Sequence, residues 1–406
     1  MNHDIIIIGA GPAGLALARS LAGTNLNVLL VEKSPQQSLR DPAPDGREIA
    51  LTHLSLRLLQ ELGAWQRISP EAVTPIVGAR VLNGDSPYSL NFDNRGEPEE
   101  ALGFMVSNHL IRRALYEEVE EIANVELLTE VAVEDLTTDA HAATVVLSNG
   151  ERRTAELVVA ADSRFSASRR RMGIPARMRD FSRVAIVCRM EAEQAHNNMA
   201  YECFHYGRTL AVLPLPEGMC SIVITVPTAL GQEIVAMEEN EFNADIERRF
   251  DHRLGAMRLI GERHVYPLVA VHADRFVAQR FALVGDAAVG MHPVTAHGFN
   301  LGLRGADTLA REISNALAQG SDFASAQVLE SYQSRHMRVT RPMYYGTNGI
   351  VGLFTNDSAP AKAVRQLVLR VANNFPPVKH LITSRLTEKE TTGLIVPLRR
   401  PRSGLR

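Results

Sequence analysis

Residues 4–14 read Asp-Ile-Ile-Ile-Ile-Gly-Ala-Gly-Pro-Ala-Gly, a short apolar run that leads into three glycines. An Ala/Leu-rich stretch continues to Leu21, so the pattern predicts a buried strand, a tight turn and a helix. In such a unit Gly9 permits the turn, Gly11 lets the backbone approach a pyrophosphate, and Gly14 lets the helix pack on the strand. The helix N-terminus then faces the phosphate charge. This stretch predicts the first βα unit of a Rossmann-like α/β fold.

The strand expected next ends in an acid. Asn27 to Val31 reads as that strand, and Glu32 follows it, 18 residues after Gly14. A carboxylate at this distance can accept both hydroxyls of an adenosine ribose. The three glycines alone are a weak signal, because glycines also serve ordinary turns. Strand, helix and acid together predict a dinucleotide-binding unit, and they leave NAD and FAD both open.

A second strand and turn stand far along the chain. Arg280-Phe-Ala-Leu-Val284 predicts a strand that ends in Gly285-Asp286. Ligands of open α/β sheets bind beyond the carboxyl ends of the strands, so Asp286 is placed to bond a polyhydroxyl chain. A helix cap is the alternative role for this acid.

His292-Pro293 and Gly298-Phe-Asn300-Leu-Gly302 follow, ahead of an apolar helix expected from Leu303 to Ala318. Glycines at 298 and 302 bring backbone N–H groups and a helix N-terminus against a ligand that can become anionic.

These segments, in this order, resemble the FAD-dependent aromatic hydroxylases of the para-hydroxybenzoate hydroxylase fold. The resemblance implies that Asp286 binds the ribityl chain of FAD and that Pro293 lies beside the flavin. It also implies that the turn from Gly298 through Asn300 stabilises negative charge at the N1–C2 carbonyl edge of the flavin. His297, beside that turn, is the candidate functional histidine.

Residues 162–169, Asp-Ser-Arg-Phe-Ser-Ala-Ser-Arg, are similar to the Asp-Gly-x-x-Ser-x-x-Arg segment of the same family. The resemblance implies that Asp162 contributes to the FAD site. Ser163 departs from the family's glycine, and a serine keeps such a turn only where the backbone is not in a glycine-only conformation. Because the family associates this segment with NADPH as well, the preference for a pyridine nucleotide stays open.

Two further FAD contacts are implied upstream. Residues 45–51 resemble the segment in which an arginine contacts the FAD phosphates, and Arg47 is the candidate. A surface salt bridge is its alternative role. Val131 is expected to end the strand that abuts the adenine, and it reads equally as a core valine.

Within the family the motif order is closest to the ubiquinone-biosynthesis hydroxylases. Ala296-His297 depart from the usual Gly-Gln of that branch, so the regioselectivity stays open. Ala200-Tyr-Glu202-Cys-Phe204 is similar to its substrate-sheet segment. Glu202, His205 and Tyr206 lie in the sheet expected to cover the flavin, which makes them candidate substrate bases. A plain strand-surface residue is the alternative for His205.

The expected fold class is α/β: a Rossmann-like FAD-binding domain with an inserted, mostly antiparallel β-sheet substrate domain and a C-terminal helical segment. Alternating runs such as Arg183–Arg189 and Ser221–Val226 predict the antiparallel strands. The expected limits are 1–175 and 275–350 for the FAD domain, 176–274 for the substrate sheet with short extra strands near 75–100, and 351–406 for the basic helical region.

The resemblance implies an FAD-dependent monooxygenase that hydroxylates the ring of a polyprenylated phenol or quinol precursor of ubiquinone, through a flavin C4a-hydroperoxide made from molecular oxygen. A second nucleotide-binding unit is not evident, so NADPH or NADH would be a transient electron donor. Three alternatives stay open: a hydroxylase of a small phenolic compound, a non-hydroxylating flavin reductase of the same fold, and a scaffold subunit that keeps its flavin to fold. Trp65 is the only tryptophan, which excludes the paired-Trp motif of tryptophan-type halogenases.

Composition sets the remaining bounds. The 406 residues are 45% hydrophobic and 22% charged, as in globular domains. Cys188, Cys203 and Cys220 form no CxxC pair, which argues against a disulfide framework or a zinc site and for three small buried residues. We therefore expect neither a metal nor a nucleic-acid partner. With no signal-peptide core or long apolar run in the sequence, we also expect a cytoplasmic location.

Positive charge is concentrated at the end of the chain. Residues 361–406 hold ten Lys or Arg against two Glu, a local charge of +8. Because the whole chain has a net charge of −3, the first 360 residues carry −11. Lys362 to Val371 predicts a basic amphipathic helix. Its functional interpretation is peripheral contact with the inner membrane or with another ubiquinone-biosynthesis protein. In the alternative, its apolar stripe docks on the FAD domain and its basic residues are solvated.

Overall fold

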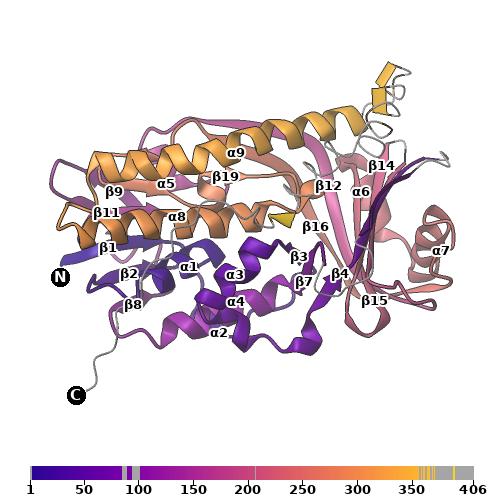
Figure 1. The fold of residues 1–406 in the computed structure, drawn as a ribbon, viewed down its shortest axis with the longest axis horizontal. Helices are drawn as coiled ribbons and strands as arrows, with labels where there is room; N and C mark the ends of the chain where they lie inside the picture. Colours follow the sequence, from indigo (N-terminus) through magenta and orange to yellow (C-terminus); the bar gives the residue numbers. More distant parts are fainter. Residues whose placement is uncertain are drawn as a thin grey trace.

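The computed structural model describes residues 2–84, 89–93, 101–205 and 207–355, together with residues 358, 360–361, 364–365, 368, 370 and 387–388. Figure 1 shows two parts side by side. In one, helices cover a sheet that begins at the N-terminus; in the other, a second sheet is built around two long strands. The long helix α9 (Ala326–Phe354) extends along both parts.

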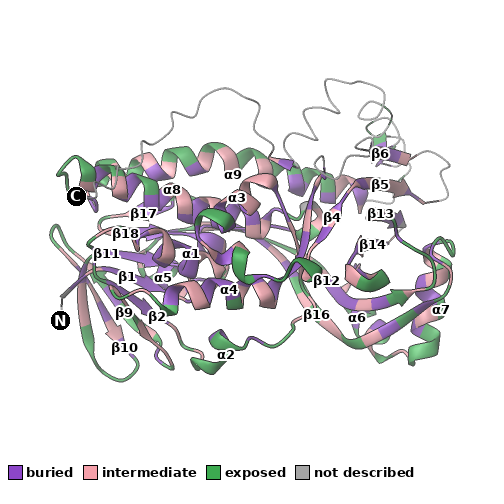
Figure 2. Cartoon of the chain, turned by 60° about the horizontal axis from the view of Figure 1, so that its bottom comes forward, coloured by how far each residue is buried: buried purple, intermediate pink, exposed green. Residues whose placement is uncertain are grey.

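The first sheet is parallel at its centre. It consists of β1 (Asn2–Ile8), β2 (Val28–Val31), β8 (Val125–Leu128), β9 (Val133–Thr138), β10 (Ala143–Leu147), β11 (Arg152–Ala160), β17 (Val277–Ala278) and β18 (Phe281–Leu283). The strand order is β17-β18-β11-β1-β2-β8, with β1 parallel to both β11 and β2. The free end of the antiparallel pair β9–β10 is exposed, whereas the central strands are buried (Figure 2). The strand order reverses at β1, which makes the carboxyl end of β1 a ligand-binding position.

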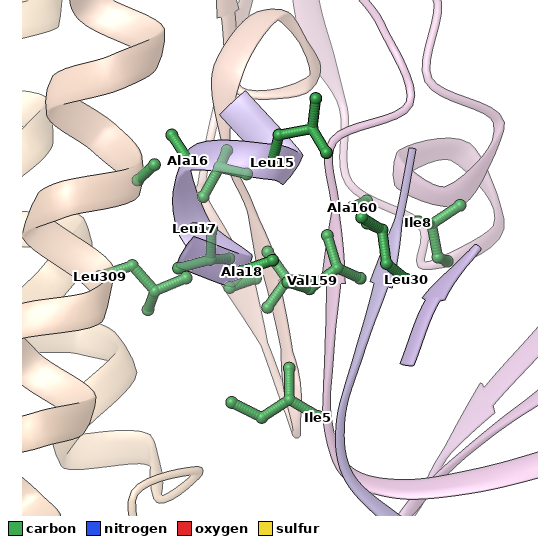
Figure 3. Packing of buried hydrophobic residues seen from close by; sticks show 14 of the residues in the cluster. Ile5, Ile8, Leu15, Ala16, Leu17, Ala18, Leu30, Val159, Ala160 and Leu309 are labelled. Carbon is green, nitrogen blue, oxygen red and sulfur yellow. The ribbon is translucent and has the colours of Figure 1, made fainter. Parts of the chain in front are cut away.

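Helices bury both faces of this sheet. They are α1 (Pro12–Ser20), α4 (Asn108–Glu120), α8 (Gly298–Ala318) and α9, with the short helices α2 (Gln37–Arg40), α3 (His53–Glu61) and α5 (Ala167–Arg171). Leu17 of α1 lies between Val159 of β11 and Leu309 of α8 (Figure 3). All three side chains are fully buried, and burial of each contributes about 1.5–3 kcal/mol to stability. The four isoleucines of β1 are at most 6% exposed, as the opening run predicts.

The second sheet is antiparallel except for one pair of strands. It consists of β5 (Gly78–Asn83), β6 (Ser89–Asp93), β12 (Ala176–Ala192), β13 (Met199–His205), β14 (Arg208–Pro214), β15 (Met219–Pro227), β16 (Met257–Ala273) and β19 (Val289–Gly290). Their order is β19-β16-β12-β15-β14-β13-β5-β6, and only β13 and β5 run parallel. Helices α6 (Thr228–Ala236) and α7 (Glu239–Arg249) pack on its outer face. Cys188, Cys203 and Cys220 lie buried there with free thiols, as expected.

A small sheet of β3 (Glu48–Leu51), β4 (Thr74–Ile76) and β7 (Gly103–Ser107) lies between the two parts. The remaining elements are single 3-10 turns: η1 (Ala64–Arg67), η2 (Pro70–Ala72), η4 (Pro216–Gly218), η5 (Gly285–Ala287) and η6 (Pro293–Thr295). The fold class expected from the sequence is confirmed, while the four domain limits stay a prediction. Among the described residues, no helix combines the length and the apolar character needed to cross a membrane.

Two expected boundaries were wrong. The helix expected from Leu303 to Ala318 begins at Gly298 instead, because the two glycines that suggested a turn lie within the first two turns of α8. Val131 does not end a strand: β8 stops at Leu128, and Val131 lies in the connection to β9, where its N–H donates to the carbonyl of Glu32 at 3.1 Å. Most of the expected helix from Lys362 to Val371, and the basic residues after it, lie outside the described residues.

Candidate cofactor site

The three positions after β1 are glycines for different structural reasons. At Gly9, φ is +105°, and a Cβ would lie 2.7 Å from the carbonyl oxygen of Ala161. At Gly14, a Cβ would lie 1.9 Å from the carbonyl oxygen of Gly9. Gly11 has an ordinary φ of −73°, and a Cβ there would meet no atom within 4 Å. The fold therefore requires the first and third glycines, whereas the space over Gly11 fits the close approach of a pyrophosphate.

Glu32 lies beside this turn, directly after β2. One of its carboxylate oxygens accepts from the N–H of Ala10 at 2.8 Å, and the other accepts from the N–H of Ser34 at 2.9 Å. Each carboxylate oxygen has two lone pairs, so both can accept a further hydrogen bond. The carboxylate is thus fixed at the edge of the glycine turn with capacity for a diol.

Three segments that are distant in sequence meet at the start of α1. Gly285 has a φ of +61°, and a Cβ there would lie 2.7 Å from the Cβ of Ala13 in α1. A Cβ on Gly302 in α8 would lie 3.4 Å from the Cα of Gly285. The turn that carries Asp286 is therefore in contact with the first turns of both α1 and α8. Two helix N-termini and a carboxylate converge here, as a ligand with a diphosphate and a polyhydroxyl chain requires.

Asp286 is held by an arginine that the sequence analysis did not single out. The Nη2 and Nε atoms of Arg164 donate to its Oδ2 at 2.9 and 3.2 Å, and Nη1 of Arg164 donates to the carbonyl of Val269 at 3.1 Å. The buried Arg169 donates to the carbonyl of Ala287 at 2.8 Å. Both arginines belong to the 162–169 segment, so this segment is fastened to the Asp286 turn. Its similarity to the family segment was the signal that could have drawn attention to Arg164.

Asp162 works mainly within its own segment. Its carboxylate accepts from the hydroxyl of Ser166 and from the N–H of Ser168, the latter at 3.1 Å. Ser166 in turn caps α5 by accepting from the N–H of Arg169 at 2.9 Å. Asp162 therefore shapes the turn between β11 and α5, next to Gly9.

A serine was expected at position 163 only if the backbone there did not adopt a conformation that favours glycine, and this expectation was wrong. Its φ is +86°, in the region that favours glycine. Ala296, which also replaces a usual glycine of the family, has a φ of +53°. The backbone at both sites keeps the conformation for which the family's glycine is suited, at a cost of about 1–2 kcal/mol each.

Asn300 connects α8 to the small sheet. Its Oδ1 accepts from the N–H of Thr52 at 3.1 Å, and its Nδ2 donates to the carbonyls of Ala50 and Ala296 at 2.9 and 2.8 Å. Both N–H donors of the amide are therefore used inside the protein. The side chain fixes the turn ahead of α8 against the β3–α3 junction.

The other residues of this turn differ in exposure. His297 is the N-cap residue of α8 and is 3% exposed. Pro293 begins η6 and is exposed, and a Cβ on Gly298 would meet no atom within 4 Å. Open space at Gly298 and at Gly11 fits a ligand that lies along both backbones.

Arg47 lies beside the second sheet. Its Nε donates to Asp45 at 2.9 Å, and its guanidinium lies 5.5 Å from the ring centre of Tyr266 in β16. These contacts match the salt bridge that was its alternative role, and they do not by themselves bring Arg47 to the glycine turn. His205 closes β13 opposite Arg208; its side chain and the whole of Tyr206 lie outside the described residues.

His292 is buried at the start of the turn that carries Pro293. Its Nδ1 accepts from the N–H of Val294 at 3.2 Å, and its ring lies edge-on to Phe181 at 4.8 Å. Burial, together with the positive charges of Arg183 and Arg179, lowers the pKa of His292 to about 4. The ring is therefore neutral at physiological pH.

A cavity of about 320 Å³ opens between the small sheet and the second sheet. Its wall includes the ion pair between Glu48 and Arg189, with 2.6 Å between Oε1 and Nη2. Leu215 and Met219 line the cavity and also pack in the apolar cluster that contains Ala200. The cavity thus adjoins the face of the second sheet that is turned toward the FAD part.

The fold and the converging glycine segments fit a bound FAD, and residues 2–345 match the family described as "FAD binding domain". A Pseudomonas aeruginosa structure titled "pqsL, a probable FAD-dependent monooxygenase" has the same fold, with a TM-score of 0.76 at 21% identity over 88% of this chain and 97% of that one.

Two relatives specify the family further. The chain is 50% identical over 391 residues to the "Ubiquinone hydroxylase UbiM" of Neisseria meningitidis, covering 95% of this chain and 85% of the relative. It is 34% identical over 378 residues to the "Ubiquinone hydroxylase UbiL" of Rhodospirillum rubrum, covering 93% and 88%. The chain belongs to this family of FAD-dependent hydroxylases, and FAD, molecular oxygen and NAD(P)H are its cofactor and co-substrates.

Proposed function

We propose that the chain hydroxylates the aromatic ring of a polyprenylated phenol or quinol precursor of ubiquinone. The printed names of its two relatives support this substrate class. One structural observation carries the proposal: the turn of Gly285 and Asp286 touches the start of α1 through Ala13 and the start of α8 through Gly302. Bound there, FAD supplies the oxygen atom that is added to the ring, once it has been reduced and has reacted with O₂.

The sequence-derived site residues of the cofactor site have the following proposed roles. Gly9, Gly11 and Gly14 form the turn for the pyrophosphate, Glu32 binds the ribose, and Asp286 binds the ribityl chain. Gly298, Asn300, His297 and Pro293 face the flavin ring, where Gly298 offers its N–H and Asn300 positions the turn. Asp162 shapes the neighbouring turn, Val131 packs at the adenosine end next to Glu32, and Arg47 is the candidate for the phosphates.

The second sheet supplies the apolar side of the site. Phe204 of β13 packs in one cluster with Val294, the residue after Pro293. An apolar surface over the flavin edge keeps water from the reacting oxygen and accommodates a prenylated ring.

The test combines colour, turnover and product mass. The purified protein should be yellow, and its reduced flavin should reoxidise rapidly in air. A deletion strain should accumulate a ubiquinone precursor that lacks one oxygen atom, and the purified enzyme should add that atom. A product heavier by two hydrogen atoms would instead establish a reductase. Turnover of simple phenols alone would establish a hydroxylase of small phenolic compounds.

We also propose a membrane contact for the C-terminal region. Val364 and Val368 are 46% and 43% exposed, while Arg365 between them is buried with its guanidinium 5.8 Å from the ring centre of Phe354. This exposure favours an outward apolar stripe over one docked on the FAD part. An outward apolar stripe, together with the basic residues that the sequence places after it, suits an anionic lipid surface.

Liposome flotation tests the membrane contact. The wild type should float with anionic vesicles at low salt and less at high salt, and a variant with Arg399, Arg400 and Arg402 changed to Glu should not. Val364→Ser with Val368→Ser should also weaken flotation. Equal behaviour of all three proteins would remove the proposal and leave the flavin chemistry unaffected.

A further inference from the structure

Glu202 lies on the face of β13 that is turned toward the flavin part. Its neighbours along the strand point the other way: Tyr201 packs edge-on to Phe250 at 5.1 Å, and Cys203 is buried under α7. Side chains alternate along a strand, so Ala200, Glu202 and Phe204 share the opposite face. We call this face of the second sheet the inner face.

Apolar side chains surround Glu202 on this inner face. Along β13, Ala200 and Phe204 flank it, both less than 9% exposed. Across the sheet, its register partners are Val81 on β5 and Ala211 on β14. No described residue donates a hydrogen bond to its carboxylate or forms an ion pair with it. Glu202 is of intermediate exposure, and a carboxyl that is partly desolvated on an apolar wall favours a polar ligand as its partner.

Three segments pack against the residues that flank Glu202, and one of them is the turn that carries Pro293 in the cofactor site. Ala200 packs with Met105 of β7, while Phe204 packs with Val294 and, at 4.3 Å between ring centres, with Phe354 of α9. Val294 follows Pro293 and lies four residues before Gly298, where α8 begins. Glu202 therefore lies between two residues of β13 that contact the small sheet, α9 and the turn ahead of α8.

Burial raises the pKa of Glu202 to about 8, with no nearby charge contributing. The charged groups of the flanking strands, Arg80 and Arg208, share register with Tyr201 and His205 and so belong to the outer face. The charged and titratable groups near the facing segments are His292, His297, Arg365, Arg179 and Arg183, the last of which donates to the carbonyl of Gly207. His292 is neutral because burial, with Arg183 and Arg179, lowers its pKa to about 4. A carboxyl that titrates near 8 exchanges protons with a phenol more readily than an ordinary glutamate does.

We propose that Glu202 is a catalytic residue that binds the ring hydroxyl of the substrate and accepts its proton. The inference rests on the proposed function. In this step the O–H bond of the phenol breaks, its electron pair stays on the phenolic oxygen, and a new O–H bond forms on the carboxylate of Glu202. No electrons are exchanged. The ring of the phenolate is more electron-rich than that of the phenol, which favours its attack on an electrophilic oxygen. Because the rest of the inner face is apolar, Glu202 is the polar group on it that binds the ring hydroxyl.

The decisive variant is Glu202→Gln, which keeps the size of the side chain and its hydrogen bonding but cannot ionise. Glu191→Gln is the matched control, because Glu191 is a carboxylate of the same sheet in an exposed ion pair with Arg258. FAD content and kcat are measured from pH 6.5 to 9. In the wild type and in Glu191→Gln, kcat should rise through pH 8. In Glu202→Gln, FAD content should stay normal, kcat should fall roughly 100-fold, and the rise should vanish.

A second readout does not depend on turnover. A phenolic substrate analogue is added to the oxidised holoenzyme, and the absorbance of its phenolate is followed with pH. Bound to the wild type, the analogue should ionise at higher pH than in Glu202→Gln, because the carboxyl of Glu202 ionises first and its negative charge disfavours a phenolate beside it. Identical pH profiles and identical phenolate spectra for the two proteins would overturn the role of Glu202. Failure of the wild type to hydroxylate any prenylated phenol would count against the proposed function instead, whatever Glu202 does.

Discussion

Arg164 donates two hydrogen bonds to the same oxygen of Asp286, at 2.9 Å from Nη2 and 3.2 Å from Nε to Oδ2. The two residues are 122 positions apart in sequence. Both side chains are about one-third exposed, at 30% and 34%, so the pair lies at the edge of the site rather than in the core. Because both hydrogen bonds reach Oδ2, Oδ1 keeps its full capacity to accept, and the arginine fixes the orientation of the carboxylate.

The first prediction separates these two residues. Asp286→Ala should weaken FAD binding by about 1.5–3 kcal/mol, or roughly 10–150-fold, because a ribityl hydroxyl loses a charge-assisted partner. Arg164→Ala should weaken it less, by several-fold, since the carboxylate remains but is no longer oriented. Fluorescence titration of the apoprotein with FAD gives both dissociation constants.

Asp322→Ala is the control for that titration, because Asp322 also pairs with an arginine, Arg280, at 2.8 Å between Nη2 and Oδ2. Its FAD affinity should match the wild type. An Asp286→Ala protein with wild-type affinity would remove Asp286 from the site.

The second prediction contrasts two glycines of the opening turn. Gly11→Val should fold normally, since its side chain meets no protein atom within 4 Å of the Cβ position and its φ is ordinary. It should fail to bind FAD, because the side chain fills the space of the pyrophosphate. Gly14→Ala should be destabilised by about 1–3 kcal/mol or more even without FAD, since its Cβ would lie 1.9 Å from the carbonyl oxygen of Gly9.

Thermal unfolding of the two apoproteins, followed by circular dichroism, and FAD content after reconstitution distinguish the two effects. A Gly11→Val protein with one FAD per chain would show that the opening turn does not bind the pyrophosphate.

Much of the flavin part could be predicted because its sequence signals lie close together in the chain. The isoleucine run, the glycine turn and Glu32 lie within one βα unit, and their spacing encodes strand, turn and helix. The start of α8 was misplaced for a local reason too: Gly298 and Gly302 suggested a turn, but glycines also occur where a helix packs closely. A Cβ on Gly302 would lie only 3.4 Å from the Cα of Gly285, a contact that no local pattern reveals.

The partners that complete the site are long-range. Arg164 could not be matched to Asp286, because nothing local shows that β11 and β18 are parallel neighbours. The position of Glu202 in a strand was predictable, but its flanking Val81 comes from β5, which joins the sheet in parallel from more than 100 residues upstream. Side-chain alternation gives the face of a strand, whereas the neighbours across the sheet depend on topology.

The third prediction concerns Ser163 and Ala296, which have φ values of +86° and +53°. Ser163→Gly and Ala296→Gly should each stabilise the protein by about 0.5–1 kcal/mol, since relief of left-handed strain exceeds the greater unfolded-state entropy of glycine. Urea unfolding measures the change. Ser148→Gly, at an exposed site with no positive φ, should not stabilise the protein. Loss of stability in both glycine variants would show that the serine and alanine side chains contribute more than the strain costs.

The last prediction is an acid sensitivity that originates in α9. His336 is 1% exposed, and neither of its ring nitrogens has a hydrogen-bond partner among the described residues. Its ring stacks on Tyr332 at 5.8 Å, and its Nε2 lies 2.8 Å from where a Cβ on Gly305 would be. Burial, with smaller contributions from Arg304 and His272, lowers the pKa of His336 from 6.5 to about 3.

The sign follows from proton binding. Between pH 6.5 and 3 the unfolded chain holds a proton on His336 and the folded chain does not, so the free energy of unfolding falls as the pH falls. The slope approaches about 1.4 kcal/mol per pH unit for one such histidine. His292 has a pKa of about 4 in the folded chain, so it adds to this slope between pH 6.5 and 4. The burial of Asp245 is outweighed by Arg208 and Arg249, so its pKa is lowered and it contributes only at more acid pH.

Glu202, whose pKa is raised to about 8, changes stability in the opposite direction between pH 6.5 and 4.5, so urea unfolding of the holoenzyme in this range compares variants that all keep Glu202. His336→Leu replaces the ring by an apolar side chain of similar volume, and its stability should decline less steeply with acidification than that of the wild type. His141→Leu, which changes an exposed histidine, should keep the wild-type slope. If His336→Leu and the wild type lose stability in parallel over this range, the buried ring of His336 is not the source of the acid sensitivity.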